Sequence, residues 1–244
     1  MIGTLKKTIH ELAHSLGFDL IRDSPHYSYR LRRIRVMKHL GVDIVLDVGA
    51  NCGQYAGDIR GDGFEGQIVS FEPVAATFEA LSRASSGDLE WRVIRTAVGE
   101  HDGEVEIKVA EDSTCSSLLT VGSELIRAHP TALQVRVERV PMTRLDTIAE
   151  SVFGNAERPW LKIDVQGYEK QVLEGLAGYI KRLLCIEVEL SLRPLYDGEA
   201  DFGGMLAWLA SAGFELVSLG TGAVDQTTGF VLQIDGIFVR RGVV

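Results

Sequence analysis

The sequence predicts an α/β domain built on a mostly parallel sheet with helices on both faces. Apolar runs that suit strands alternate with amphipathic helical segments along most of the chain. Several of these runs are too continuous for half-exposed strands, which favours strands buried in a parallel sheet. The 244 residues suffice for one such domain, and no repeat, low-complexity tract or linker interrupts them. We therefore expect one domain over residues 42–244, with a helical extension over residues 1–41 packed on it.

The extension begins with an apolar stripe at three- and four-residue steps, which predicts a helix. Its members are Ile2, Leu5, Ile9, Leu12 and Leu16. Pro25 ends this segment, and residues 29–41 predict a second helix that stops at Gly41. Residues 1–40 carry eight Lys/Arg against three Asp/Glu, a net charge of +5, whereas the remainder carries −14. This basic start fits peripheral contact with an anionic membrane surface or an acidic partner, or a solvated helix face.

The body of the chain then alternates strands and helices in order. Buried strands are predicted over residues 42–50, 66–73, 89–99, 159–167 and 182–190, with helices over 53–61, 75–85, 168–180 and 202–213. Residues 103–111 and 133–141 alternate apolar and polar side chains, which predicts exposed antiparallel strands. The last two strands are expected over residues 214–220 and 229–240.

Composition excludes several function classes. The acidic body opposes nucleic-acid binding, which depends on neutralising phosphates. Cys52, Cys115 and Cys185 are odd in number and far apart, so we expect neither a disulfide framework nor a thiolate zinc site, and a reducing cytoplasm fits. No apolar run approaches the roughly 20 residues that span a bilayer, and we expect no signal peptide.

The stretch "VLDVGANCGQY" places Asp47, Gly49 and Gly53 at the carboxyl end of the first sheet strand. Ligands of open α/β sheets bind at such strand ends, and glycine lets the backbone approach them closely. Asn51 stands where the dinucleotide pattern G-x-G-x-x-G has glycine. Glu72 ends the second strand about 20 residues later, the place of an acid that accepts ribose hydroxyls. Loop and acid together predict an adenosine-type ligand, either NAD or S-adenosylmethionine.

Beyond this loop, the chain from about Val42 to Arg240 resembles the FkbM family of S-adenosylmethionine-dependent methyltransferases. The resemblance rests on "DVGANCG", "FEP", "TAVGEHDGEV", "CSSL", "RLDTI", "WLKIDVQGYEKQVLEGL", "IEVEL" and "DGIFVR". It implies a class I methyltransferase (Rossmann-like) fold, whose seven-stranded sheet has one final antiparallel strand. It also implies O-methylation of a hydroxyl on a small molecule such as a sugar, a glycolipid or a polyketide-type natural product.

The resemblance further implies roles for single residues around the cofactor. The glycine loop would line the methionine and ribose, Glu72 would hold the ribose hydroxyls, and the segment after the third strand would lie beside the adenine. Asp164 would face both the methyl donor and the acceptor. The full set of expected cofactor-binding residues is Asp47, Gly49, Ala50, Asn51, Gly53, Glu72, Pro73, Thr96, Ala97, Val98 and Asp164.

Candidate catalytic residues are the acids at two strand ends, Asp164 and Glu187. Asp164 could accept the hydroxyl proton or cap the helix that begins near Tyr168. Glu187 and Glu189 share one strand face at i, i+2, and with Asp164 they could bind Mg²⁺. The alternative is that Lys162, Arg182 or Arg193 neutralises them.

The acceptor pocket is expected between the 111–134 insert, the N-terminal helices and the 190–202 loop. None of the six histidines lies in a strong motif, although His129 in the insert could belong to a lid over the substrate. An NAD-linked sugar oxidoreductase or epimerase is the alternative function. Its glycine triplet and Y-x-x-x-K pair are both missing from the sequence.

Overall fold

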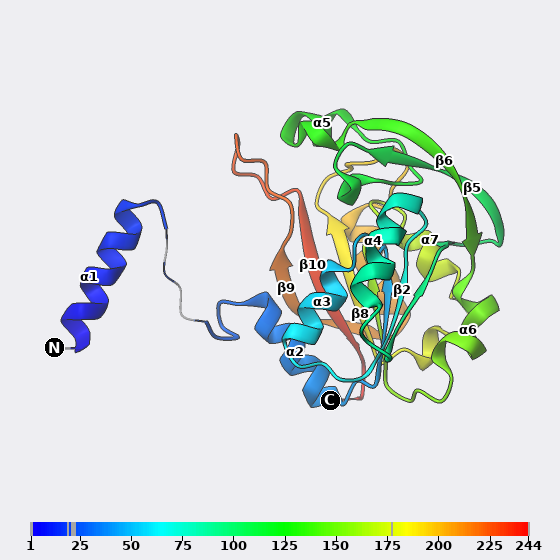
Figure 1. The fold of residues 1–244 in the computed structure, drawn as a ribbon, viewed down its shortest axis with the longest axis horizontal. Coiled ribbons are helices and arrows are strands. Elements are labelled where there is room, and N and C mark those ends of the chain that lie inside the picture. The colour runs from blue at the N-terminus through cyan, green and yellow to red at the C-terminus, as the bar shows by residue number, and fades with distance from the viewer. Residues whose placement is uncertain (1, 19, 21–22, 177, 244) are drawn as a thin grey trace.

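A seven-stranded sheet forms the centre of the protein (Figure 1). The computed structural model describes residues 2–18, 20, 23–176 and 178–243. The strands run in the order β3-β2-β1-β7-β8-β10-β9, and β10 is antiparallel to both of its neighbours. Their bounds are β1 Ile44–Val48, β2 Gln67–Phe71, β3 Trp91–Ile94, β7 Pro159–Ile163, β8 Cys185–Ser191, β9 Phe214–Thr221 and β10 Gln233–Arg240. This arrangement confirms the predicted class I methyltransferase fold.

The two most central strands explain where a ligand can bind. All five residues of β1 and all five of β7 are buried, as their continuous apolar runs predict. The chain leaves β1 for β2 on one side and later returns through β7 on the other, so the strand order reverses between them. A crevice therefore opens at the carboxyl ends of β1 and β7.

Helices cover both faces of the sheet, and each face has its own apolar core. On one face, α2 (Tyr29–Leu40), α3 (Gln54–Gly61) and α4 (Ala75–Ser85) pack on side chains such as Val45 and Trp160. On the other, α6 (Leu145–Phe153), α7 (Glu169–Glu174) and α8 (Phe202–Ser211) pack on Leu46 and Leu161. Consecutive residues of one strand thus serve opposite cores, as the alternation of strand side chains requires.

Four elements differ from the sequence prediction. Helices α6 and α5 (Ser123–Ala128) lie in segments for which the sequence predicts no element. The helix predicted over 168–180 ends at Glu174, because Gly175 packs on the backbone of Gly99, where a Cβ would lie 1.9 Å from the carbonyl oxygen. A short 3₁₀ turn follows at Ile180–Arg182. The strand predicted over 89–99 is split into β3 and β4 (Ala97–Val98), which belong to different sheets.

A second, three-stranded sheet has the order β4-β6-β5. Strands β5 (Gly103–Ala110) and β6 (Gln134–Thr143) are antiparallel, as predicted from their alternating pattern. The segment between them carries the turn η1 (Ser113–Cys115), α5 (Ser123–Ala128) and the turn η2 (Pro130–Ala132). Figure 1 shows this insert beyond one end of the main sheet. It is the end at which β1, β2 and β7 terminate, so the insert lies near the ligand crevice.

The two N-terminal helices lie differently. Helix α2 belongs to the domain core through Ile34, Met37 and Leu40, whereas α1 (Ile2–Ser15) stands apart from the body in Figure 1. Ile9, Leu12 and Leu16 are 49%, 62% and 67% exposed, while the side chains of Ile2 and Leu5 lie outside the described part. The division into an extension over residues 1–41 and a domain over residues 42–244 stays a prediction. No helix in the described residues is both long and apolar enough to cross a membrane.

Candidate active site

A cavity of about 360 Å³ opens at the carboxyl ends of β1, β2 and β7. Its volume lies in the range of small-molecule sites. Nine of the eleven predicted cofactor-binding residues line it: Gly49, Ala50, Asn51, Glu72, Pro73, Thr96, Ala97, Val98 and Asp164. Asp47 and Gly53 do not. Asp47 is completely buried beneath the loop, and Gly53 packs on Trp91 at the start of α3.

The glycine loop is shaped by close backbone packing. Gly49 has φ +80°, and a Cβ there would lie 1.8 Å from the carbonyl oxygen of Asp164. The loops after β1 and β7 therefore touch through backbone alone, which only glycine allows. Asn51 also has a positive φ, of 47°, a conformation that asparagine tolerates better than most residues. This explains why asparagine can stand where the dinucleotide pattern has glycine.

Glu72 is tied to the same loop. Its Oε2 accepts a hydrogen bond from the Asn51 N–H at 2.9 Å, and its Oε1 accepts from the Val74 N–H and the Thr77 hydroxyl, both at 2.8 Å. Burial raises the pKa of Glu72, although these three hydrogen bonds oppose the rise. An ionised carboxylate has about four acceptor positions, so roughly one remains for a ribose hydroxyl. A second hydroxyl would have to replace one of the present donors.

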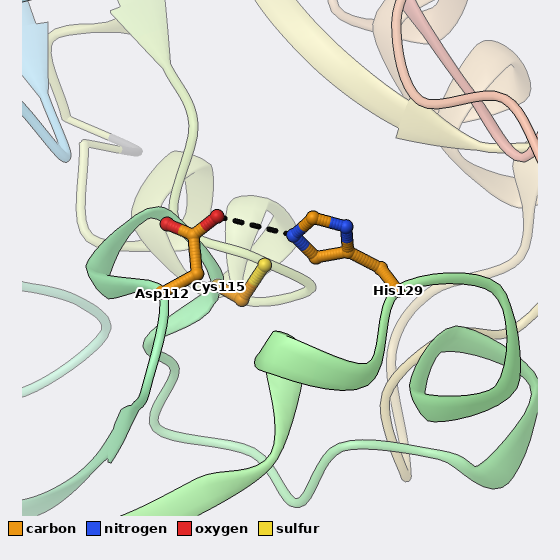
Figure 2. A group of neighbouring side chains, drawn as sticks. All are labelled: Asp112, Cys115 and His129. Atoms are coloured by element: carbon orange, nitrogen blue, oxygen red, sulfur yellow. Dashed lines mark hydrogen bonds and ion pairs between the residues drawn. The ribbon is translucent and has the colours of Figure 1, made fainter.

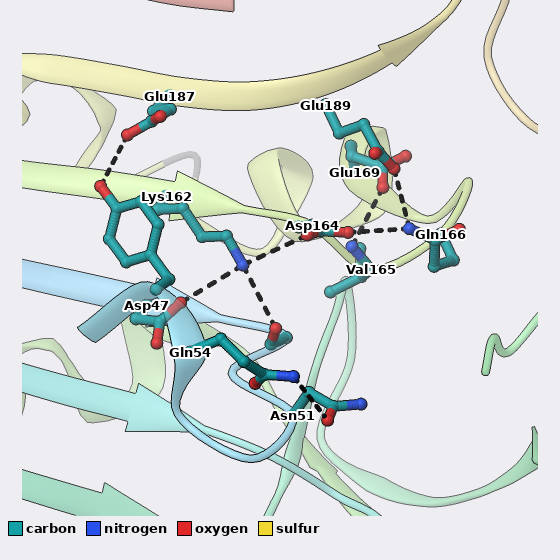
Figure 3. A network of polar contacts seen from close by, with 12 residues as sticks. Asp47, Asn51, Gln54, Lys162, Asp164, Val165, Gln166, Glu169, Glu187 and Glu189 are labelled. Carbon is teal, nitrogen blue, oxygen red and sulfur yellow. Dashed lines mark hydrogen bonds and ion pairs between the residues drawn. The ribbon is translucent and has the colours of Figure 1, made fainter. Parts of the chain in front are cut away.

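A buried lysine joins two acids at the centre of the crevice (Figure 3). The Lys162 ammonium lies 3.3 Å from Asp47 Oδ1 and 3.5 Å from Asp164 Oδ2, and it donates to the Gly49 carbonyl at 3.2 Å. Burial lowers the pKa of Lys162, but Asp164 and Asp47 outweigh burial, and the pKa is raised. Lys162 is therefore the positive centre of the site. Lys162, Arg182 and Arg193 were the cations predicted to neutralise the acids, and Lys162 is the one that pairs with Asp164.

Asp164 is held at the edge of the cavity with part of its carboxylate open. Besides Lys162, the Gln166 amide donates to its Oδ1 at 2.8 Å, and the side chain stays 37% exposed. It does not cap α7, whose N-cap, Tyr168, makes no side-chain cap bond. The Glu169 carboxylate instead accepts the N–H groups of Val165 and Gly167, both at 3.1 Å. Burial raises the pKa of Glu169 to about 7.

Glu187 lines the same cavity but is already occupied. Its Oε1 accepts from the Tyr29 hydroxyl at 2.9 Å and its Oε2 from the Tyr55 hydroxyl at 2.6 Å. Arg33 lies 3.7 Å away and stacks over the Tyr55 ring at 4.6 Å. This carboxylate thus joins α2 and α3 to β8. Nothing in the sequence pattern signals the tyrosines, which are 26 residues apart.

Glu189 has a different environment. Its Oε2 accepts from the amides of Gln166 and Gln233, at 2.8 and 2.7 Å. Burial, with Asp164 and Asp235 nearby, raises the pKa of Glu189 well above its usual range. Burial likewise raises the pKa of Asp235 to about 7. Burial therefore favours the neutral, protonated form of both acids.

The predicted Mg²⁺ ligands do not come together. In the described part of the chain, three ligand atoms within 4.8 Å of one another occur at Asp112, Cys115 and His129, not at Asp164, Glu187 and Glu189. Each acid of β8 has its own partners: Glu187 accepts from two tyrosines beside Arg33, whereas Glu189 accepts from Gln166 (Figure 3) and Gln233. The i, i+2 spacing of Glu187 and Glu189 correctly predicts that both lie on one strand face. It does not bring their carboxylates together with Asp164 as one group of ligands.

A second cavity of about 410 Å³ adjoins the first, and both are lined by Thr114, Asp164, Gln166 and Glu189. Its other walls come from the 111–134 insert and from residues 223–233, not from the 190–202 loop that was expected to take part. The N-terminal helices contribute to the first cavity instead, through Tyr29 and Arg33 of α2. Asp164 therefore lies at the junction of the first and second cavities.

Comparison with known proteins settles the family. The model of the methyltransferase FkbM domain matches residues 47–216. The chain belongs to the FkbM methyltransferase family. It is a methyltransferase that uses S-adenosylmethionine, which decides against the NAD-linked alternative. No curated protein matches the chain.

Several solved structures are similar to this chain at low sequence identity. A fibrillarin/Nop5p complex is 15% identical, with TM-score 0.47 over 82% of this chain and 73% of that one. The methyltransferase domain of bacterial CtHen1 is 12% identical, with TM-score 0.44 over 86% and 96%. Aeropyrum pernix fibrillarin with bound S-adenosylmethionine is 10% identical, with TM-score 0.47 over 81% and 66%. At these values the likenesses say nothing of this chain's substrate.

The residues present fit the cofactor. The loop of Gly49 to Gly53 leaves the cavity wall free of bulky side chains, and Glu72 keeps an acceptor position beside it. Phe71, Ala97 and Val98 supply apolar surface for a flat ring. The acids Glu72, Asp164 and Glu187 line the cavity and suit a ligand that carries a sulfonium and an ammonium group.

Proposed function

We propose that the enzyme methylates a hydroxyl group of a small molecule, such as a sugar, a glycolipid or a polyketide-type product. The observation that carries this proposal is the carboxylate of Asp164, partly open at the junction of the two cavities and held by Lys162 and Gln166. The bound cofactor supplies a methyl group that its sulfonium charge has already activated. The protein must then align an oxygen and take up its proton.

Asp164 has the properties that this proton transfer requires. Lys162 and Gln166 hold the carboxylate in place, while the exposed part of the side chain can accept a hydrogen bond from the acceptor hydroxyl. Because an alcohol is a very weak acid, the proton would move to Asp164 as the new bond forms, and such general base catalysis contributes about 10²–10⁴-fold. Alignment of the oxygen contributes the larger share. Glu187, predicted as a second catalytic acid, is in this proposal a positioning residue for Tyr29 and Tyr55.

The second cavity is the proposed place of the acceptor. It combines amide groups of Gln226 and Gln233 with apolar side chains of Leu125 and Leu232. Such a mixed lining suits a molecule with hydroxyls on an apolar frame. Charged phosphate backbones fit it poorly, because Asp112, Asp164 and Glu189 also line it.

The test is a panel of acceptors with release of S-adenosylhomocysteine as the readout. Sugars, glycolipids, polyketide alcohols, matched compounds with an amine or thiol in place of the hydroxyl, and RNA are compared at equal concentration. Turnover confined to hydroxyl compounds supports the proposal. Turnover on amines, thiols or RNA but not on hydroxyl compounds contradicts it.

We propose further that α1 docks on anionic membrane surfaces. Ile9 and Leu12 are exposed on α1, Leu16 is exposed just beyond its end, and residues 1–40 as a whole carry a net charge of +5. Vesicles with anionic lipid should pellet the full chain, and Leu12→Gln with Leu16→Gln should release it. Equal pelleting of this variant, or equal pelleting with zwitterionic vesicles, would contradict docking. The variant is preferable to deleting residues 1–40, which would remove α2 from the core.

A further inference from the structure

Asp112, Cys115 and His129 form a compact cluster in the insert between β5 and β6 (Figure 2). One potential ligand atom from each lies within 4.8 Å of the other two. Any two members are at most seventeen chain positions apart, yet the sequence shows no recognised metal spacing among them. The fold of η1 and η2 against each other brings them together.

The Asp112 carboxylate is oriented by one of its oxygens. Its Oδ1 accepts from the Thr114 N–H at 3.0 Å and from the Thr114 hydroxyl at 2.7 Å. The other oxygen, Oδ2, lies 3.1 Å from His129 Nε2. Metal-binding carboxylates are commonly held in this way, with one oxygen fixed by the chain and the other available to the ion.

The contacts of His129 converge on one ring nitrogen, which differs from the arrangement of a proton relay. Nε2 of His129 lies 3.1 Å from Asp112 Oδ2 and 3.1 Å from Thr131 Oγ1, and Figure 2 shows the Cys115 sulfur beside the same pair. A catalytic relay uses the two ring nitrogens for two partners. Here carboxylate, thiol and hydroxyl gather around a single nitrogen, which can hold only one proton. A shared cation would satisfy all of them, and Thr131 would yield its contact.

The donor set and its spacing indicate the kind of ion. Bond lengths of zinc to sulfur, nitrogen and oxygen place the ligand atoms of a tetrahedral site roughly 3.3–3.6 Å apart. The cluster reaches such spacing with small side-chain movements. One sulfur and one imidazole favour a borderline metal over Mg²⁺ or Ca²⁺, which prefer oxygen.

We propose that Asp112, Cys115 and His129 bind zinc or a similar divalent ion, with a fourth coordination position open to the second cavity. All three residues line that cavity, as do Asp164 and Gln166. Binding would release the thiol proton of Cys115, since thiolate is the ligand form. The open position could then hold an oxygen of the acceptor within the cavity that Asp164 also lines. This last role, unlike metal binding itself, rests on the proposed function.

The experiment is a zinc titration of the full chain against a competing chelator. His10 and His14, four residues apart on α1, could also bind zinc, so the parent for all measurements carries His10→Gln and His14→Gln. One equivalent of zinc should bind. Cobalt should give the intense near-ultraviolet band of a thiolate ligand. Cys115→Ser should abolish this band, and Cys115→Ser, Asp112→Asn or His129→Gln should each weaken zinc binding more than about 100-fold.

Matched variants separate ligation from general damage. Thr114→Val removes only an outer partner of Asp112 and should weaken zinc binding by roughly 10–100-fold. Cys52→Ser and His101→Gln should leave it unchanged. Absence of stoichiometric zinc binding, or equal binding in the parent and Cys115→Ser, overturns the proposal. Calorimetry with S-adenosylmethionine on each variant checks folding. If the cofactor fails to bind even the parent, the proposed function fails while the zinc result still stands.

Discussion

The two cavities that meet at Asp164 are built in different ways. The first is walled largely by turns directly after β1, β2 and β7, where close backbone packing requires Gly49. The second is walled by side chains of the insert and of residues 223–233, which are about 100 positions apart in the chain. In the proposed arrangement, recognition of the cofactor depends on local backbone geometry, and recognition of the acceptor depends on long-range assembly. The bond from Asn51 Nδ2 to Ser113 Oγ, 3.0 Å long, links the two regions.

Replacing Asp164 should have the largest effect, and it should lower turnover while leaving cofactor affinity nearly unchanged. Asp164→Asn removes the proton acceptor but keeps the bond to Gln166 in reach, so we expect turnover to fall about 10²–10⁴-fold. Affinity for S-adenosylmethionine, measured by calorimetry, should change only a few-fold. The exposed Asp197→Asn serves as control. A parallel loss of turnover and cofactor affinity would contradict this prediction, because Asp164 would then serve cofactor binding as well as proton transfer.

Replacing Glu72 should instead weaken binding of the cofactor. Glu72→Ala should weaken S-adenosylmethionine binding by roughly 10–100-fold, because a hydrogen bond to a charged group contributes about 1.5–3 kcal/mol. Thr77→Val removes one donor that positions Glu72 without touching the cavity lining, and should cost only a few-fold. Equal affinity of Glu72→Ala and wild type would show that the acid holds the loop and not the ribose.

The buried Glu169, which holds the turn after β7, predicts a pH dependence of stability. Its pKa is about 7 in the folded protein against an ordinary 4.5, so between these values the folded state keeps a proton that the unfolded state has lost. The free energy of unfolding should therefore fall as pH rises from about 5 to 7. Glu169→Gln should remove about 1 to 3 kcal/mol of this fall in urea titrations. Exposed Glu65→Gln is the control, and an unchanged slope in Glu169→Gln would refute the assignment.

The smallest expected effect concerns the link between the regions. Ser113→Ala removes the partner of Asn51 at the cost of one neutral hydrogen bond, about 1 kcal/mol. Turnover and cofactor affinity should each change less than about tenfold. Ser116→Ala, a change in the same turn region, provides the comparison. A loss as large as that of Asp164→Asn would show that the two regions work as one unit.

The sequence predicted those parts of the fold that follow from local patterns. The buried strands β1, β2, β7 and β8, the antiparallel pair β5 and β6 and the position of the glycine loop were all correct. Its errors have physical causes. The break between β3 and β4 and the early end of α7 depend on Gly99, Gly175 and the second sheet, which no local pattern reveals.

The acids illustrate what only the tertiary structure could decide. Sequence alone determined that Glu187 and Glu189 share a strand face and that Asp47, Glu72 and Asp164 stand at strand ends, because strand periodicity and parallel topology are properties of short segments. It could not determine their partners. The tyrosines on Glu187, the amides on Glu189 and the lysine between Asp47 and Asp164 come from different elements, and packing decides which donor reaches which oxygen. The cluster of Asp112, Cys115 and His129 likewise exists only where two turns of the insert fold together, because no repeating spacing connects its members.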